Sequence, residues 1–279
     1  MQYCPDHVVR SAGECPKDIL YDFIFICIKS FPGSKPSLMD MIRPAVRTPN
    51  TAIILAQNGI AIEDELTREY SENPLLSCVV YLPATQTEHG IIHYPETLNL
   101  LQIGTFPSNA PESHKAAAKW LCRLVIEGGG VAEVHDDIQR ARWSKLLMNC
   151  AWNPISALSM CTDGDFLLSS SPYAYDLVWS VMMEIVELAQ KSGIPNVDAK
   201  VTEKQLSIAK RRAETKQGRE VSMLQDVKQG RLFEVEAIVG NTVRLGRKWG
   251  VEMPLTEAMY ALAKGRFDAI VRQQQMAAA

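Results

Sequence analysis

The segment Tyr21-Asp-Phe-Ile-Phe-Ile-Cys-Ile-Lys29 is an unbroken apolar run between a charged start and a Phe-Pro-Gly stop. Its length and its β-branched and aromatic residues predict a strand buried on both faces, as in a parallel sheet. Thr51-Ala-Ile-Ile-Leu-Ala-Gln57 predicts a second buried strand, and Leu75 to Leu82 a third. The first half of the chain is therefore expected to be α/β.

The remaining patterns separate the chain into two parts. In the first half we expect helices at Leu38–Val46, Glu63–Tyr70 and Pro111–Ile126, and short strands around His89–Tyr94 and Asn99–Ile103. In the second half we expect only helices, at about Asp136–Leu158, Tyr173–Ser192, Asp198–Lys216, Ser222–Lys248 (in two pieces) and Pro254–Gln275. The prediction is an α/β plus all-α fold, with one domain over residues 1–135 and an all-helical domain over 136–279.

Composition limits the kinds of partner. A net charge of −3 gives no electrostatic reason to bind nucleic acid or an acidic membrane, and the longest apolar runs are too short to span a bilayer. Basic residues gather between Lys204 and Arg219, where the pattern favours a solvated helix face over a phosphate or carboxylate contact. Seven cysteines without C-x-x-C spacing predict buried thiols in the cytoplasm, and the five histidines show no metal-ligand spacing.

Three polar residues follow one another at intervals of four within Trp143–Pro154, inside the helix predicted at about Asp136–Leu158. Lys145, Asn149 and Asn153 share one face of that helix, and the residues between them are mostly apolar. A lysine and two amides on a buried helix require partners. The stripe predicts either a binding site or one surface lysine with two amides that cap neighbouring backbone.

Four motifs, taken together and in their order along the chain, resemble those of a known family. They are Lys29 at the end of the first predicted strand, Gln57-Asn58-Gly59 after the second, Trp143-x-Lys145-x3-Asn149-x3-Asn153-Pro154, and Ser222-Met-Leu-Gln-Asp226 followed by Phe233-Glu-Val-Glu-Ala-Ile-Val-Gly240. With these motifs the chain resembles ketopantoate reductase (2-dehydropantoate 2-reductase) from about residue 20 to about residue 255. The resemblance implies a truncated Rossmann-type parallel sheet domain, followed by a helical domain similar to that of 6-phosphogluconate dehydrogenase.

The resemblance also implies an activity. It predicts an NADP-dependent oxidoreductase of pantothenate biosynthesis that transfers hydride from NADPH to a small 2-oxo acid or related carbonyl compound. A homodimer is expected from the same resemblance.

Roles carry over residue by residue. By resemblance Lys145 is the general acid, and Glu234 holds and orients the substrate hydroxyl, although spacing alone does not separate Glu234 from Glu236. Asn149, Asn153 and Ser222 are expected to bind substrate, and Lys29 and Asn58 to bind cofactor. Ser222 also opens a predicted capping box with Gln225.

One departure lies in the substrate site. Cys161-Thr-Asp163-Gly164 stands where the family usually has C-x-N-G, whose asparagine touches substrate. Asp163 is therefore a predicted substrate-binding residue. Its negative charge beside a carboxylate substrate indicates a substrate other than ketopantoate.

A second departure concerns the cofactor. The chain contains no G-x-G-x-x-G, the loop that lets backbone approach a dinucleotide pyrophosphate. Without the family's first βαβ unit, Asp22–Lys29 becomes an apolar edge strand. Three explanations are open: the sequence is an incomplete version of an intact reductase, Asp6-His-Val-Val-Arg10 pairs with that edge, or a divergent protein pairs the edge with another copy. Two alternative functions are a cofactor-independent homologue that uses Lys145 and Glu234 on another metabolite, and a non-catalytic interaction protein.

Overall fold

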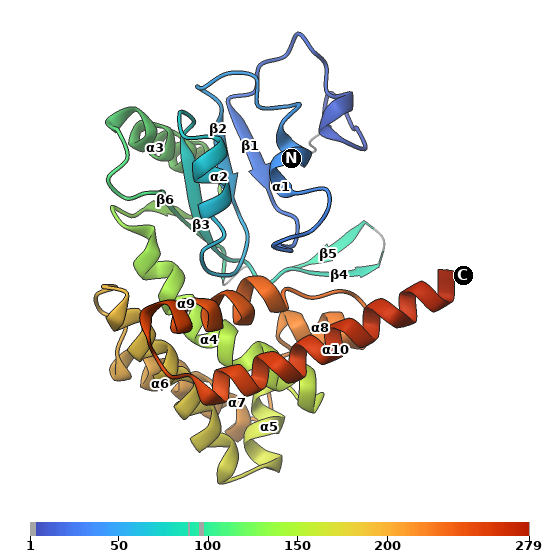
Figure 1. The fold of residues 1–279 in the computed structure, drawn as a ribbon, viewed down its shortest axis with the longest axis vertical. Helices are drawn as coiled ribbons and strands as arrows, with labels where there is room; N and C mark the ends of the chain where they lie inside the picture. The colour runs from blue at the N-terminus through green and yellow to red at the C-terminus, as the bar shows by residue number, and fades with distance from the viewer. Residues whose placement is uncertain (1–3, 89, 95–97, 279) are drawn as a thin grey trace. The chain divides into compact units, whose positions relative to one another are not determined.

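The computed structural model describes residues 4–88, 90–94 and 98–278, which form two units (Figure 1). Unit 1 comprises Met1–Ile28, Pro32–Gln57 and Ile62–Ile138; unit 2 comprises Lys29–Phe31, Asn58–Ala61 and Gln139–Ala279. Two short segments of the amino-terminal half, 29–31 and 58–61, thus belong to the same compact unit as the carboxyl-terminal half. The domain bounds 1–135 and 136–279 stay a prediction.

Unit 1 contains a five-stranded sheet in the order β1-β2-β3-β6-β7. Figure 1 labels four of these strands, β1, β2, β3 and β6. The strands are β1 Phe23–Ile26, β2 Ala52–Leu55, β3 Leu75–Tyr81, β6 Leu100–Thr105 and β7 Ala132–Val134. β1, β2 and β3 are parallel neighbours, as are β6 and β7, whereas β3 and β6 are antiparallel. The predicted fold class is confirmed, but the sheet is mixed. The chain between β3 and β6 forms a hairpin, β4 Thr85–Glu88 with β5 Ile91–His93, and so supplies no crossover helix.

The helices of unit 1 are short apart from one. They are the 3₁₀ turn η1 Ala12–Glu14, α1 Leu38–Ile42, α2 Asp64–Glu69 and α3 Glu112–Glu127. α3 packs on one face of the sheet, where a core forms from Ala52, Ile54, Leu76, Cys78, Ile103, Ala118 and Leu121. Trp120 of α3 reaches Phe23 of β1, with ring centroids 4.7 Å apart. The core residues of β2 and β3 alternate along each strand, and those of α3 lie three positions apart, as expected for one buried face of each element.

β1 stands at the end of the sheet order, as expected for an edge strand. The prediction that it is buried on both faces is wrong, because Phe25 is 48% exposed. The idea that residues 6–10 pair with this edge is also wrong, since these described residues belong to no strand. An apolar edge strand with exposed side chains results.

All regular elements among the described residues of unit 2 are helices or helical turns. Its helices are α4 Ile138–Ser159, α5 Asp163–Ser169, α6 Tyr173–Lys191, α7 Ala199–Glu214, α8 Ser222–Lys228, the π-helical turn η2 Glu236–Gly240, α9 Asn241–Trp249 and α10 Pro254–Ala278. Its core includes fully buried Leu147, Met182, Ile185 and Phe233. No helix in the described ranges is long and apolar enough to cross a bilayer.

Besides the three-residue turn η1, three elements were not predicted. β4 and β7 have four and three residues, and α5 has seven, so each is too short for a hydrophobic period to stand out. The strand predicted around His89–Tyr94 corresponds to β5 Ile91–His93, while His89 lies outside the described residues.

Candidate functional site

α4 and the segment 58–61 bring together two of the predicted site residues. The Nζ atom of Lys145 donates a hydrogen bond to Asn58 Oδ1 at 2.8 Å. Both residues belong to unit 2, although 87 positions separate them in the chain. The predicted general acid and a predicted cofactor contact are therefore direct neighbours.

Three hydrogen bonds to its backbone hold the segment that carries Asn58. Arg142 Nη1 donates to the carbonyl oxygen of Gly59 at 3.0 Å, and the amide of Ile60 donates to Ala237 O at 3.0 Å. Asn241 Nδ2 donates to Ile60 O at 2.7 Å. Gly59 has φ +107°, and a Cβ there would lie 2.6 Å from Ala237 O. The Gln57-Asn58-Gly59 motif thus requires glycine at its third position, where a side chain would meet η2.

Glu234 is a second partner of the Asn58 side chain. Its side chain accepts a hydrogen bond from the amide of Ser30 at 2.9 Å and is only 8% exposed. Burial raises the pKa of Glu234, while the Ser30 amide, the Lys29 charge and a hydrogen bond from Asn58 act in the opposite direction. Asn58 therefore links the ammonium of Lys145 to the carboxyl group of Glu234.

Glu236, which spacing could not separate from Glu234, has a different environment. Its carboxylate accepts hydrogen bonds from Arg244 Nη1 at 2.9 Å and from the hydroxyl of Tyr260 at 2.9 Å. These contacts tie α9 and α10 to η2. The geometry thus gives Glu236 a structural environment and leaves Glu234 beside Lys145.

Lys29 forms an ion pair with Asp226, the last residue of the Ser222–Asp226 motif. Asp226 is 3% exposed and also accepts a hydrogen bond from Arg231 Nε at 3.2 Å. Two cations therefore neutralise a buried carboxylate, as such a group requires. The predicted cofactor contact of Lys29 competes with this ion pair.

The environment of Lys145 disfavours its charged form. Burial is the largest cause, and the positive charges of Arg142 and Arg219 add to it, so that the pKa of Lys145 falls to about 8. The carboxylate of Glu234 acts against this shift. A lysine that titrates near neutral pH can both hold and release a proton, as acid catalysis requires.

Asn153 and Ser222 are brought together, whereas Asn149 stands apart. Asn153 Oδ1 accepts hydrogen bonds from the Met223 amide at 3.2 Å and from Ser222 Oγ at 3.4 Å. Asn149 is partly exposed, and its side-chain amide makes no hydrogen bond to another described residue. The predicted capping box of Ser222 and Gln225 is wrong: Val221 is the N-cap of α8, so the Ser222 hydroxyl bonds instead to Asn153.

Asp163 begins α5 and is engaged by other groups of unit 2. Arg212 Nη1 donates to its Oδ2 at 2.6 Å, and the amides of Gly164 and Arg219 each donate to its Oδ1 at 2.7 Å. With an exposed fraction of 3%, its carboxylate is compensated within the protein. The expected repulsion between Asp163 and a substrate carboxylate is thereby reduced.

Sequence reasoning missed Arg142 and Arg219. Both act on the charge of Lys145, from α4 and from the loop before α8 respectively. Arg142 stands three residues before Lys145, one helical turn away, and that spacing was available from the sequence. Arg219 was visible only as the last member of the basic run that begins at Lys204.

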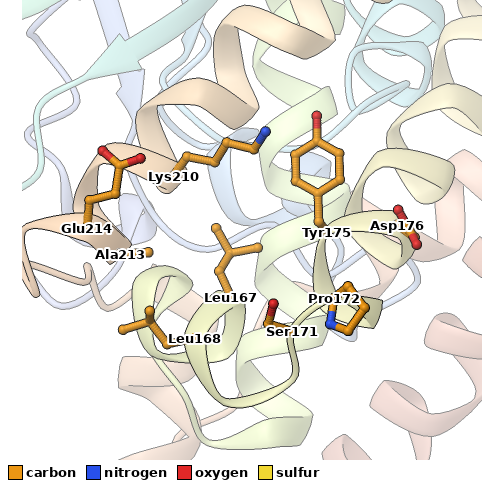
Figure 2. A pocket seen from close by; sticks show the side chains of 9 residues that line it. All are labelled: Leu167, Leu168, Ser171, Pro172, Tyr175, Asp176, Lys210, Ala213 and Glu214. Carbon is orange, nitrogen blue, oxygen red and sulfur yellow. The ribbon is translucent and has the colours of Figure 1, made fainter.

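A pocket of about 400 Å³ lies elsewhere in unit 2, between α5, the start of α6 and α7 (Figure 2). Lys210 Nζ lies 3.9 Å from the ring centroid of Tyr175 at this pocket. None of the predicted site residues lines it. Among the described residues there is also no cluster of three or more His, Cys, Asp or Glu side chains suited to a metal ion.

Two family models match the chain. That of the ketopantoate reductase PanE/ApbA C terminal matches residues 137–267, and that of ketopantoate reductase PanE/ApbA matches residues 3–108. The structure of 2-dehydropantoate 2-reductase from Methylococcus capsulatus is 31% identical and has a TM-score of 0.77; the match covers 92% of this chain and 77% of that one.

Two further relatives extend the comparison. A 2-dehydropantoate 2-reductase from Aquifex aeolicus is 26% identical over 245 residues, which are 88% of this chain and 76% of that protein. The ternary structure of D-mandelate dehydrogenase with NADH and anilino(oxo)acetate has a TM-score of 0.76 at 21% identity, over 93% of this chain and 80% of that one. At that identity the last match shows a shared fold.

Proposed function

Since this chain belongs to the ketopantoate reductase family, we propose that it is an oxidoreductase that transfers hydride from NADPH to a small 2-oxo acid. A place in pantothenate biosynthesis fits the family. The observation that carries the proposal is the hydrogen-bonded series from Lys145 through Asn58 to Glu234. The relatives give no support to the cofactor-independent or non-catalytic alternatives.

Lys145 would act as the general acid. As the carbonyl carbon of the substrate gains a hydride, negative charge grows on its oxygen, and a positioned ammonium both stabilises that charge and donates a proton to it. A pKa of about 8 for Lys145 keeps most of the group protonated at neutral pH and makes the proton easier to release than from an exposed lysine. Asn58 Oδ1, which accepts a hydrogen bond from Nζ, holds the ammonium in place.

The other predicted residues would bind and orient the substrate. Glu234 would accept a hydrogen bond from a substrate hydroxyl group, with its own position fixed by the Ser30 amide. Ser222 would contact the substrate carboxylate, and Asn153 fixes the start of the helix that carries it. The side-chain amide of Asn149 makes no hydrogen bond within the described residues, so that its donors and its acceptor are available for substrate.

A nicotinamide cofactor would supply the hydride, and NADH in D-mandelate dehydrogenase supports such a cofactor at the level of the fold. The placement of two residues in the chain supports a site for its nicotinamide end. β1 and β2 are parallel, so Lys29 and Asn58 follow the carboxyl ends of adjacent strands, where open α/β sheets bind ligands. Asn58 would hold this end, and Lys29 would join it where the cofactor replaces Asp226 as the partner of the Lys29 ammonium. The preference for NADP, a homodimeric assembly and a cytoplasmic location belong to the same proposal.

The proposal is tested with this chain by fluorescence titration of NADPH and by ketopantoate-dependent oxidation of NADPH. We expect binding and turnover, with turnover lost in Lys145→Met and retained in Lys200→Met, which replaces an exposed lysine of α7. A folded protein that binds neither NADPH nor NADH would contradict the proposal. Turnover that survives in Lys145→Met would contradict the role of Lys145.

A further inference from the structure

We propose that Arg219 binds the carboxylate of the 2-oxo acid and that Asp163 is a positioning residue for Arg219. The inference rests on the proposed function and deepens it. It assigns substrate recognition to a side chain in the loop between α7 and α8, and it gives Asp163 a role other than substrate contact.

The backbone of Arg219 is fixed against the start of α5. Its amide donates to Asp163 Oδ1 at 2.7 Å, and its carbonyl oxygen accepts from the Asp163 amide at 3.3 Å. The preceding Gly218 permits this approach, because a Cβ on it would lie 2.0 Å from Thr162 Oγ1. Gly164 lies at the same close approach between the two segments, since a Cβ on it would lie 3.0 Å from Gly218 Cα. The backbone of Arg219 therefore has a defined position, because both its amide and its carbonyl oxygen are hydrogen-bonded to Asp163.

The guanidinium of Arg219 remains available for an external anion. The Oδ2 atom of Asp163 is bonded to Arg212 at 2.6 Å. Over the described residues, no hydrogen bond joins the Arg219 side chain to a protein acceptor, and this side chain retains solvent access. Desolvation and the nearby Arg212 lower the pKa of Arg219, while Asp163 acts in the opposite direction. An arginine without a hydrogen-bonded acceptor suits a planar carboxylate, which its fork can bind with two hydrogen bonds.

Two observations support a place for Arg219 near the substrate carboxylate. It is close enough to Lys145 for its charge to lower the pKa of that lysine. It also precedes Ser222 by three residues, and Ser222 Oγ lies 3.4 Å from Asn153 Oδ1 on the helix that carries Lys145. In a 2-oxo acid the carboxylate is bonded directly to the carbonyl carbon. The cation that binds the carboxylate must therefore lie near the acid that protonates the carbonyl oxygen, and an anion between the two cations would relieve their repulsion.

This arrangement changes the interpretation of Asp163. A carboxylate in place of the family's asparagine would repel an anionic substrate if it faced the substrate. Here it is buried and compensated by Arg212 and two backbone amides. Asp163 thus holds a cation near the site, and ketopantoate is again compatible with the charge of the site.

The test compares ketopantoate with its neutral amide, which has nearly the same size and lacks the charge. For Arg219→Met we expect the KM for ketopantoate to rise about 30- to 100-fold, with kcat within about threefold and the KM for the amide nearly unchanged. Arg219→Lys should recover part of the loss. Arg211→Met, which removes an exposed arginine of α7, is the matched control and should change neither KM. Asp163→Asn should raise the KM for ketopantoate about tenfold, since the position of Arg219 is loosened.

Calorimetric titration of ketopantoate into the same variants separates this inference from the proposed function. Wild-type binding that weakens in Arg219→Met supports the inference even if no NADPH is oxidised, in which case only the proposed function fails. Turnover with equal KM changes for ketopantoate and its amide, or with none, would overturn the inference alone. A wild-type chain that neither binds nor reduces ketopantoate would overturn both.

Discussion

Replacement of Lys145 by methionine is expected to stabilise the protein while it removes catalysis. Burial, with help from Arg142 and Arg219, lowers the pKa of Lys145 from 10.5 to about 8. The charged form is therefore less favourable in the folded state than in the unfolded state. This destabilisation is complete below about pH 8, decreases between about pH 8 and 10.5, and is absent above that range.

The magnitude follows from the shift of the pKa of Lys145. A difference of about 2.5 pKa units corresponds to about 3 kcal/mol at neutral pH. Methionine keeps the unbranched stem but leaves Asn58 Oδ1 without the Lys145 donor, which costs about 1 kcal/mol. The net expected gain in the free energy of unfolding is about 2 kcal/mol at pH 7.

Urea denaturation of the wild type, Lys145→Met and the exposed control Lys200→Met measures this gain. Between pH 7 and pH 9.5 the advantage of Lys145→Met should shrink by about 2 kcal/mol, because the wild-type lysine loses its proton in the folded state. The control should show no advantage at either pH. A Lys145→Met protein that is less stable than the wild type at pH 7, or an advantage that does not change with pH, would refute the reasoning.

Three further predictions concern the same site. Since Lys145 must be protonated to act as an acid, kcat/KM for ketopantoate should fall about tenfold per pH unit above about pH 8; a flat profile up to pH 10 would contradict its role. Glu234→Gln should lower kcat/KM at least about 100-fold, whereas Glu236→Gln should change it less than about threefold and lower stability by about 1 kcal/mol, because Glu236 joins helices; equal kinetic losses would show that the two glutamates are misassigned. Gly59→Ala should destabilise the protein by about 2 to 3 kcal/mol, because its Cβ meets Ala237 O at 2.6 Å and φ is +107°; an unchanged melting temperature would mean that segment 58–61 is not fixed as described.

Long apolar runs and helical periods predicted most of the fold. The runs at Tyr21–Lys29, Thr51–Gln57 and Leu75–Leu82 correspond to β1, β2 and β3. The predictions of secondary structure failed where the local hydrophobic pattern is weak. β4, β7 and α5 are too short to show a hydrophobic period. β6 is antiparallel to β3 because a hairpin joins them, and hydrophobic periodicity does not predict the direction of a strand.

The candidate site was predictable where its residues share one element. The interval of four between Lys145, Asn149 and Asn153 follows from helix geometry alone. Other members were supplied by resemblance, which includes the preference for Glu234 over Glu236. Nothing local to the sequence indicates that Asp163 is paired with Arg212 or that Arg219 lies near Lys145.

The sequence by itself determined where the longer strands and helices lie, and which face of α4 carries the polar stripe, because these follow from backbone sterics and from side-chain periods within a few residues. Only the tertiary structure decided the partners of each charge. Lys145 and Asn58 are 87 residues apart, and Lys29 and Asp226 are 197 apart. Whether a buried carboxylate serves as a structural counter-ion or faces a ligand depends on which cations the fold places beside it. Those cations come from residues far away in the sequence, so local sequence patterns do not identify them.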